Sequence, residues 1–332
     1  MVLWRDAANF MSLTIPALAS SLAVERPSDE DIVGSIGAIA GDLPQIDLSY
    51  ERDIRTLWIT LKPEPKPVFT LSIIASVRKV QGAIMRRWSA VDEAPILFLA
   101  YRASGSVFSL GGDLDFYLDC LVQNDRTGLA DYARLAADVI RLNATALDGA
   151  AITLANIHGR ALGGGIDPAR ACNVLVGEEG ATFSYPEITF NHFPIAAVAI
   201  LSRHAGAPEA ERILLSGEEY SAAEFCAKGV LDAVAPDGKG EEWIRSYAGR
   251  NAGSQRARVA LIAAFNRRAG NLEQDLAEAA RMWVDHIMSL TPLEISKLQR
   301  IAQLQERMLG RALRRERAAP KAVAASEVST PA

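Results

Sequence analysis

Two acidic residues, Asp167 and Glu187, are the leading candidates for chemistry in this chain. Asp167 and Glu187 lie twenty positions apart in the stretch GRALGGGIDPARACNVLVGEEGATFSYPEITF, residues 159–190. A pair of carboxyl groups can perform acid–base catalysis, because one can remove a proton from a substrate while the other delivers one. When two such groups are buried together, the pKa of one is raised and that group stays protonated near neutral pH. Whether Asp167 and Glu187 form such a pair is a question that their residue types and spacing alone leave open.

Three adjacent glycines, residues 163–165, stand just before Asp167. Glycine adopts positive φ readily and lets another group approach its N–H closely. Between a buried strand and a helix, such glycines present N–H groups that suit an anion or a developing oxyanion. An alternative stays open here, since Asp167 followed by Pro168 could simply cap the helix that begins there. A nucleotide-binding loop is poorly supported, because GRALGGG lacks the G-x-G-x-x-G spacing.

A second glycine turn occurs upstream, in SVFSLGGDLDF of residues 106–116. There, too, a short β-like run is followed by glycines, an acid and a helical pattern. Two turns of this kind could each offer one backbone N–H to the same carbonyl oxygen. A pair of donors stabilises the negative charge that develops when a thioester forms an enolate or a tetrahedral species, and each donor is typically worth about 3 to 4 kcal/mol of barrier.

The elements that must position these residues alternate between strands and helices. Short apolar runs rich in β-branched and aromatic residues predict strands, and apolar residues at helical spacing predict helices. This alternation predicts an α/β architecture with a mainly helical end from about residue 194. The predicted strands are 54–63, 95–101, 151–157, 172–177 and 181–187, and the predicted helices are 72–88, 113–122, 127–146, 271–290 and 292–315.

Composition argues against several other classes of protein. The 35 Lys and Arg residues against 40 Asp and Glu give a net charge of −5, without the basic character of a nucleic-acid-binding protein. The three cysteines are widely spaced and the four histidines lack metal-ligand spacing, so neither a disulfide framework nor a metal site is expected. Residues 1–27 read poorly as a signal peptide, and no apolar run reaches the ~18 residues of a membrane span. We expect a cytoplasmic protein that uses no membrane.

Three ordered motifs resemble the crotonase (enoyl-CoA hydratase/isomerase) superfamily. They are FSLGGDLDF, then IHGRALGGGIDPARACNVLVGEEGATFSYPE, then SGEEYSAAEFCAKGVLDAVAP. Within it, FSLGGDL, PEITFNHFP and MWVDHIM are most similar to the diffusible signal factor synthase branch, which makes cis-2-unsaturated fatty acid signals. The resemblance implies a spiral of ββα turns with a helical C-terminal region, assembled as a homotrimer or a dimer of trimers. The expected division is an N-terminal extension (1–45), the spiral core (46–245), the helical region (246–315) and a disordered tail (316–332).

The resemblance also implies roles for individual residues. Asp167 and Glu187 stand where the family has its catalytic carboxylates, and the N–H groups of Leu110 or Gly111 and of Gly164 would form the oxyanion hole. Trp283 would line the acyl pocket, together with Ile195 and Ala196 of the segment FPIAAVAI. The two histidines near the motifs, His158 and His192, are interpreted as structural residues. Neither a cofactor nor a metal is implied.

The function implied is that of a thioester-processing enzyme. Its substrate would be a 3-hydroxyacyl thioester of acyl carrier protein or of CoA, dehydrated to the 2-enoyl thioester and then hydrolysed to the free acid. One alternative is an ordinary hydratase or isomerase acting on acyl-CoA. Another is a weakened homologue that binds an acyl thioester and regulates a sensor kinase, because the synthase branch normally carries glutamate where Asp167 stands.

Overall fold

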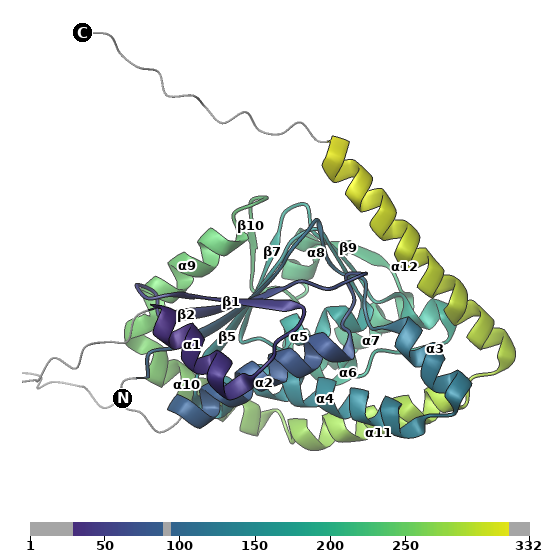
Figure 1. The fold of residues 1–332 in the computed structure, drawn as a ribbon, viewed down its shortest axis with the longest axis horizontal. Helices are drawn as coiled ribbons and strands as arrows, with labels where there is room; N and C mark the ends of the chain where they lie inside the picture. Colours follow the sequence, from purple (N-terminus) through teal and green to yellow (C-terminus); the bar gives the residue numbers. More distant parts are fainter. Residues whose placement is uncertain (1–28, 89–93, 319–332) are drawn as a thin grey trace, which may run out of the picture.

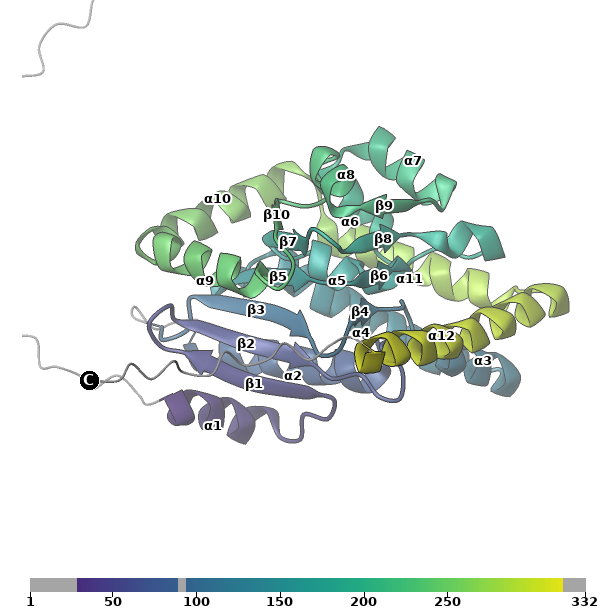
Figure 2. The ribbon, with the colours of Figure 1, turned by 90° about the horizontal axis from the view of Figure 1, so that it is seen from above.

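The computed structural model describes residues 29–88 and 94–318, and its strands form two sheets (Figures 1 and 2). The large sheet has the order β1-β2-β3-β5-β7-β10, in which β1 and β2 are antiparallel and every later pair is parallel. The small sheet has the order β4-β6-β8-β9, in which only β9 is antiparallel to its neighbour. The strands are β1 (Ile46–Glu51), β2 (Thr56–Leu61), β3 (Phe98–Ala103), β4 (Val107–Ser109), β5 (Ile152–Ile157), β6 (Arg160–Leu162), β7 (Val174–Glu178), β8 (Thr182–Ser184), β9 (Glu219–Ser221) and β10 (Ala233–Ala235).

The helices of the described part of the chain surround these sheets and dominate its C-terminal half. Short 3-10 turns link several of them: η1 (Leu147–Gly149), η2 (Gly163–Gly165), η3 (Pro186–Phe190) and η4 (Ala252–Ser254). The α-helices are α1 (Asp29–Ala40), α2 (Leu71–Trp88), α3 (Leu114–Gln123), α4 (Arg126–Ala144), α5 (Asp167–Arg170), α6 (Ala197–His204), α7 (Ala207–Ser216), α8 (Ala222–Ala227), α9 (Gly240–Asn251), α10 (Gln255–Arg268), α11 (Leu272–Met288) and α12 (Pro292–Ala318).

The chain builds both sheets at once, one strand of each per turn. β3 is followed by β4, β5 by β6 and β7 by β8, and each of these pairs adds neighbouring strands to the large and the small sheet. Helices such as α3, α4 and α5 then return the chain for the next pair. This is the spiral of ββα turns that the resemblance implied, and the helical C-terminal region is also present.

The large sheet is covered on both faces, which explains its continuous apolar strands. Every residue of β5 and of β7 is buried, as expected for parallel strands with helices on both sides. Leu57 and Ile59 of β2 face the core that contains α2 and α4, whereas Trp58 between them faces α9. Side chains alternate in this way because successive Cβ atoms of a strand point to opposite faces.

Two predicted segment boundaries need correction. Residues 1–45 are predicted to be an extension separate from the spiral core 46–245, whereas α1 packs against α2 and β1 and buries Ile32 and Ile36. Apolar residues at positions i and i+4 of a helix share one face, and here that face joins the main core. At the other end, α12 continues to Ala318, three residues into the predicted tail 316–332. The rest of that tail and residues 1–28 lie outside the described residues.

Two further properties concern the class of protein. No helix within the described ranges has both the length and the apolar composition needed to cross a bilayer. Across the same residues, no group of three or more His, Cys, Asp and Glu side chains is arranged to hold a metal ion.

Candidate active site

Three parallel strands of the small sheet end at one edge and bring together the two glycine turns and the segment that carries Glu187. β4 leads into Leu110 and Gly111, β6 leads into the glycines of η2, and β8 leads through Tyr185 into η3 with Glu187. The register pairs Ser109 with Ala161 and Leu162 with Ser184, so the loops leave the sheet at the same level. A Cβ placed on Gly165 would lie 3.0 Å from the backbone nitrogen of Gly111. The two glycine turns are therefore in direct contact.

Two of the three consecutive glycines are required by close contacts, each for a different reason. Gly163 has φ +51°, and a Cβ there would lie 1.9 Å from Glu187 Oε1. A Cβ on Gly165 would lie 2.3 Å from Ser109 Oγ. Gly164 is not constrained in this way, because the nearest atom to its added Cβ is Pro194 Cβ at 3.9 Å. Gly163 thus makes room for the acid and Gly165 makes room for the neighbouring turn.

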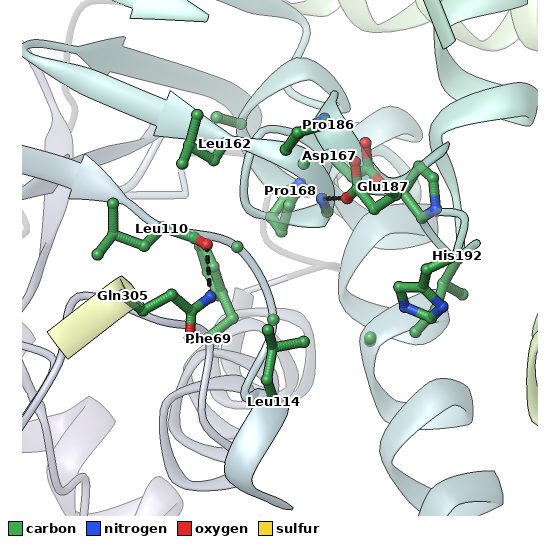
Figure 3. A pocket seen from close by; sticks show the side chains of 18 of the residues that line it. Phe69, Leu110, Leu114, Leu162, Asp167, Pro168, Pro186, Glu187, His192 and Gln305 are labelled. Carbon is green, nitrogen blue, oxygen red and sulfur yellow. Dashed lines mark hydrogen bonds between the residues drawn. The ribbon is translucent and has the colours of Figure 1, made fainter. Parts of the chain in front are cut away.

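Glu187 lies against the glycine turn and is almost fully buried, with 7% of its surface exposed. The Gly164 N–H donates a hydrogen bond to Glu187 Oε1 at 2.8 Å (Figure 3). The other carboxyl oxygen, Oε2, is buried without a hydrogen-bond partner. Burial raises the pKa of Glu187 to about 8, and the nearby Asp167 carboxyl contributes to the increase. Glu187 is therefore a buried acid that can hold a proton at neutral pH.

Asp167 is still more deeply buried, at 1% exposure. The Tyr185 hydroxyl donates to Asp167 Oδ1 at 2.9 Å, and the Ala196 N–H donates to Oδ2 at 3.3 Å. Burial raises the pKa of Asp167 to about 7, although these two hydrogen bonds act in the opposite direction. The residue preceding α5, Ile166, makes no side-chain capping bond, and the Asp167 carboxyl faces Tyr185 and Ala196. This placement favours the acid–base interpretation of Asp167 over a simple helix cap.

The three predicted oxyanion donors all have partners within the protein. The Leu110 N–H donates to the Pro67 carbonyl at 2.6 Å, and the Gly111 N–H donates to Ser109 Oγ at 3.1 Å. The Gly164 N–H is held by Glu187. None of these three N–H groups is therefore free to bind a ligand oxygen unless its present hydrogen bond is broken. Gly111 and Gly164 are the better candidates, because each is bonded to a side chain that can rotate away, whereas Leu110 is bonded to backbone.

A cavity of about 270 Å³ opens beside the two acids. One end holds Asp167, Glu187 and the glycine turns. The remainder is mainly apolar and reaches between α2, α4 and α12, so it suits an apolar ligand group rather than a wholly polar metabolite. Figure 3 shows the acids on one side of the cavity and Leu110, Leu114 and Gln305 on the other. Its apolar and aromatic lining includes Leu61, Phe69, Ile74, Val77, Phe108, Leu114, Tyr117, Tyr132, Val139, Ile140, Ile195, Trp283 and Ile301.

The three predicted pocket residues are placed differently from one another. Trp283 and Ile195 both line the cavity, and the Trp283 ring packs edge-on against Tyr117 with 4.9 Å between ring centroids. The prediction for Ala196 is wrong. Its side chain is fully buried outside the cavity lining, and the residue contributes its backbone N–H to Asp167 instead.

Two residues of the site were missed by the sequence analysis. Tyr185 orients Asp167, and its position directly before Pro186 and Glu187 was the available signal. Gln305 of α12 reaches the first glycine turn, where its Nε2 donates to the Leu110 carbonyl at 2.9 Å (Figure 3). No local pattern could have indicated Gln305, because the two residues are 195 positions apart in the sequence.

Comparison with known proteins shows sequence similarity to one family and to individual enzymes. The sequence profile of the enoyl-CoA hydratase/isomerase family matches residues 101–299. Cyclohexa-1,5-dienecarbonyl-CoA hydratase of Thauera aromatica is 26% identical over 72% of this chain and 87% of that protein. Mevalonyl-coenzyme A hydratase of Aspergillus fumigatus is 30% identical over 54% of this chain, and the chain spans 62% of it.

Solved structures share the fold at lower sequence identity. The enoyl-CoA hydratase from Bacillus halodurans superposes with a TM-score of 0.66 at 20% identity, covering 76% of this chain and 98% of that one. Pseudomonas aeruginosa DspI gives a TM-score of 0.59 at 22% identity, covering 74% of this chain and 96% of that one.

Proposed function

The chain belongs to the enoyl-CoA hydratase/isomerase family, and from that premise we propose that it interconverts 3-hydroxyacyl and 2-enoyl thioesters. The observation that carries this proposal is the pairing of two buried acids with the glycine turns at one end of an apolar cavity. Asp167 and Glu187 are the acid–base pair. The backbone N–H groups of Gly111 and Gly164 receive the thioester oxygen, and the acyl chain extends along the cavity.

The two acids divide the work of dehydration. One carboxylate removes the proton from the carbon next to the thioester, and the other carboxyl group protonates the departing hydroxyl, which leaves as water. Hydration is the same sequence in reverse. Because the pKa values of both groups are raised toward neutral pH, the pair can hold a single proton between them under physiological conditions. That singly protonated state contains both the base and the acid that the reaction needs.

Substrate binding would also release Glu187 for its task. The single Gly164 N–H cannot donate a strong hydrogen bond to Glu187 Oε1 and to a thioester oxygen at the same time. When the thioester oxygen takes this donor, the Glu187 carboxyl group is freed to face the carbon atoms next to the thioester. The N–H groups then stabilise the enolate-like charge that forms on the oxygen.

A finer proposal concerns the carrier and the product. The motifs FSLGGDL, PEITFNHFP and MWVDHIM support a substrate carried by acyl carrier protein and release of a free cis-2-unsaturated acid. The same acid pair could activate water to attack the thioester, which would cleave the carbon–sulfur bond and return the carrier thiol. An apolar cavity beside the acids would hold the aliphatic chain during both steps.

The test uses purified protein with 3-hydroxyacyl thioesters of CoA and of carrier protein in competition. Formation of enoyl thioester supports the lyase, and appearance of free 2-enoic acid by mass spectrometry supports the finer proposal. Glu187→Ala should abolish both reactions, while a control at the exposed Glu218 should not. If Glu187→Ala retained full activity, the assigned mechanism would be wrong.

The shorter acid at position 167 provides a separate prediction. Both oxygens of Asp167 already receive hydrogen bonds, from Tyr185 and Ala196. An added methylene moves the carboxyl group about 1.5 Å, and a misplacement of about 1 Å can cost roughly a hundredfold in rate. Asp167→Glu is therefore expected to lower kcat. A large gain would instead favour the alternative of a weakened homologue that binds acyl thioesters and regulates a partner such as a sensor kinase.

A further inference from the structure

His192 lies in the wall of the cavity, on the loop that follows Glu187. It is 7% exposed and lines the cavity, and Figure 3 shows it on the same side as the two acids. Its backbone N–H donates to the Glu187 carbonyl at 3.0 Å. The position of His192 is therefore tied to the backbone that carries the acid.

The hydrogen bonds of the ring determine which nitrogen carries the proton. The Trp283 indole N–H donates to His192 Nε2 at 3.3 Å. An indole N–H can only donate, so Nε2 must offer its lone pair. Burial, with a smaller contribution from the neighbouring His286, lowers the pKa of His192 to about 3 and keeps the ring neutral at physiological pH. A neutral ring with an unprotonated Nε2 carries its proton on Nδ1.

That Nδ1–H is a donor without a partner. Nδ1 is buried and makes no hydrogen bond within the described part of the chain. Buried polar groups are nearly always paired, and an exception in a cavity calls for an explanation. Packing alone does not provide one, because a phenylalanine ring would fill similar space without burying a donor. A ligand oxygen in the cavity would supply the missing acceptor after a small shift of the cavity wall, because Nδ1 itself is buried.

We propose that the His192 Nδ1–H donates a hydrogen bond to the 3-hydroxyl oxygen of a 3-hydroxyacyl thioester and so selects hydroxylated acyl chains. This inference rests on the proposed function. The hydroxyl-bearing carbon adjoins the carbon that loses its proton, so its oxygen must lie beside the acid pair, in the part of the cavity that His192 lines. His192 exchanges no proton in this role, and it distinguishes the hydroxylated substrate from an unsubstituted chain.

The experiment uses two probes that cannot be dehydrated. 2,2-Dimethyl-3-hydroxybutanoyl-CoA has no proton on the carbon next to the thioester, and 2,2-dimethylbutanoyl-CoA differs from it only in lacking the hydroxyl. The ratio of their dissociation constants, measured by calorimetry, isolates the contribution of the hydroxyl group. General damage to the cavity affects both probes and cancels in the ratio.

The wild type is expected to bind the hydroxylated probe about tenfold more tightly. His192→Phe should bring the ratio close to one, and His192→Asn, whose amide can donate from a similar position, should keep part of the preference. His286→Gln is the matched control, because His286 stacks on the His192 ring at 6.1 Å but does not line the cavity. Its ratio should equal that of the wild type.

Two results would overturn the inference, and they are distinguishable. If both probes bind and the His192→Phe ratio equals the wild-type ratio, His192 does not read the hydroxyl, while the proposed function stands. If neither probe binds to the wild type, either as a CoA thioester or as a carrier-protein thioester, the proposed function fails and the inference fails with it. Should His192→Phe not fold, the wild-type and His192→Asn ratios still decide, since a wild-type ratio near one contradicts the proposal.

Discussion

At the scale of single residues, burial is what makes the two acids useful. A carboxyl group in water is ionised at neutral pH, but Asp167 and Glu187 are 1% and 7% exposed and have pKa values near 7 and 8. The neutral form of each carboxyl group is favoured, because the low-dielectric surroundings destabilise the charged form. The two groups also repel each other when both are ionised, so they titrate as a pair.

The pH dependence of kcat/KM follows from this pairing. Below the lower pKa both groups are protonated and no base remains, while above the higher pKa both are ionised and no acid remains. The rate is therefore expected to peak between about pH 7 and pH 8. A pH profile with a single substrate tests this, and a flat profile from pH 5 to 9 would contradict it.

The pH dependence of the unfolding free energy should show the titration of Glu187 independently of catalysis. The pKa of Glu187 is raised on folding, so the folded state binds an extra proton, and stability falls as the pH rises through about 8. Glu187→Gln removes this titration and keeps an oxygen for the Gly164 N–H. Relative to the wild type, the variant should gain thermal stability between pH 5 and pH 8.5. No change in this difference with pH would show that Glu187 titrates normally.

The glycine run offers a matched pair of substitutions. Gly163→Ala places a methyl group 1.9 Å from Glu187 Oε1 at φ +51°, whereas Gly164→Ala adds the same group with 3.9 Å of clearance. Gly163→Ala should lower the unfolding free energy by about 1 to 3 kcal/mol and displace the acid. Gly164→Ala should leave the melting temperature nearly unchanged. Calorimetric scans of both variants provide the measurement, and equal losses would refute the assigned difference.

At the scale of elements, α12 controls the first glycine turn from a distance. Gln305 donates to the Leu110 carbonyl, and the planar peptide bond to Gly111 makes the orientation of the Gly111 N–H depend on the same contact. α12 thus helps to orient the Gly111 N–H, which we propose as a donor to the thioester oxygen.

Removing this contact should impair catalysis more than stability. Gln305→Leu is expected to lower kcat/KM about tenfold and to cost roughly 1 kcal/mol of unfolding free energy, because the Leu110 carbonyl loses a partner. Gln303→Leu, the same substitution at an exposed position of α12, is the control and should behave as the wild type. Kinetics together with chemical denaturation measure both effects. Identical behaviour of the two variants would exclude the proposed coupling.

The elements also show how far sequence can lead. In the sequence, a strand pattern and three glycines come just before Asp167, which places this acid at the end of a strand. The same pattern recurs at Gly111 and predicts a second turn. The contact between the two turns could therefore be predicted. The partners of their amides were not, because they depend on side-chain rotamers and on the approach of Pro67. The burial of α1 was missed because its apolar face is short and its partner strand β1 gave no separate signal.

At the scale of the whole molecule, assembly is a remaining prediction. The resemblance implies a homotrimer or a pair of trimers, and Leu261 and Phe265, four residues apart on α10, are 58% and 68% exposed. Apolar side chains at that spacing share one helix face and are typical of a contact surface. Light scattering should give about three or six times the chain mass of 35.8 kDa. A mass equal to one chain at micromolar concentration would contradict this.

The hydrogen bond from the Gly164 N–H to Glu187 makes the Glu187 carboxylate a competitor of the proposed substrate for that N–H donor. In the proposed function, a thioester oxygen that accepts from the Gly164 N–H must first displace this tethered carboxylate, which competes at high effective concentration. Substitutions that weaken this contact would tighten apparent affinity while slowing turnover. The free acid of the finer proposal would also carry a carboxylate, which could accept from the same Gly164 N–H. Such a product should therefore inhibit the enzyme more strongly than its size suggests.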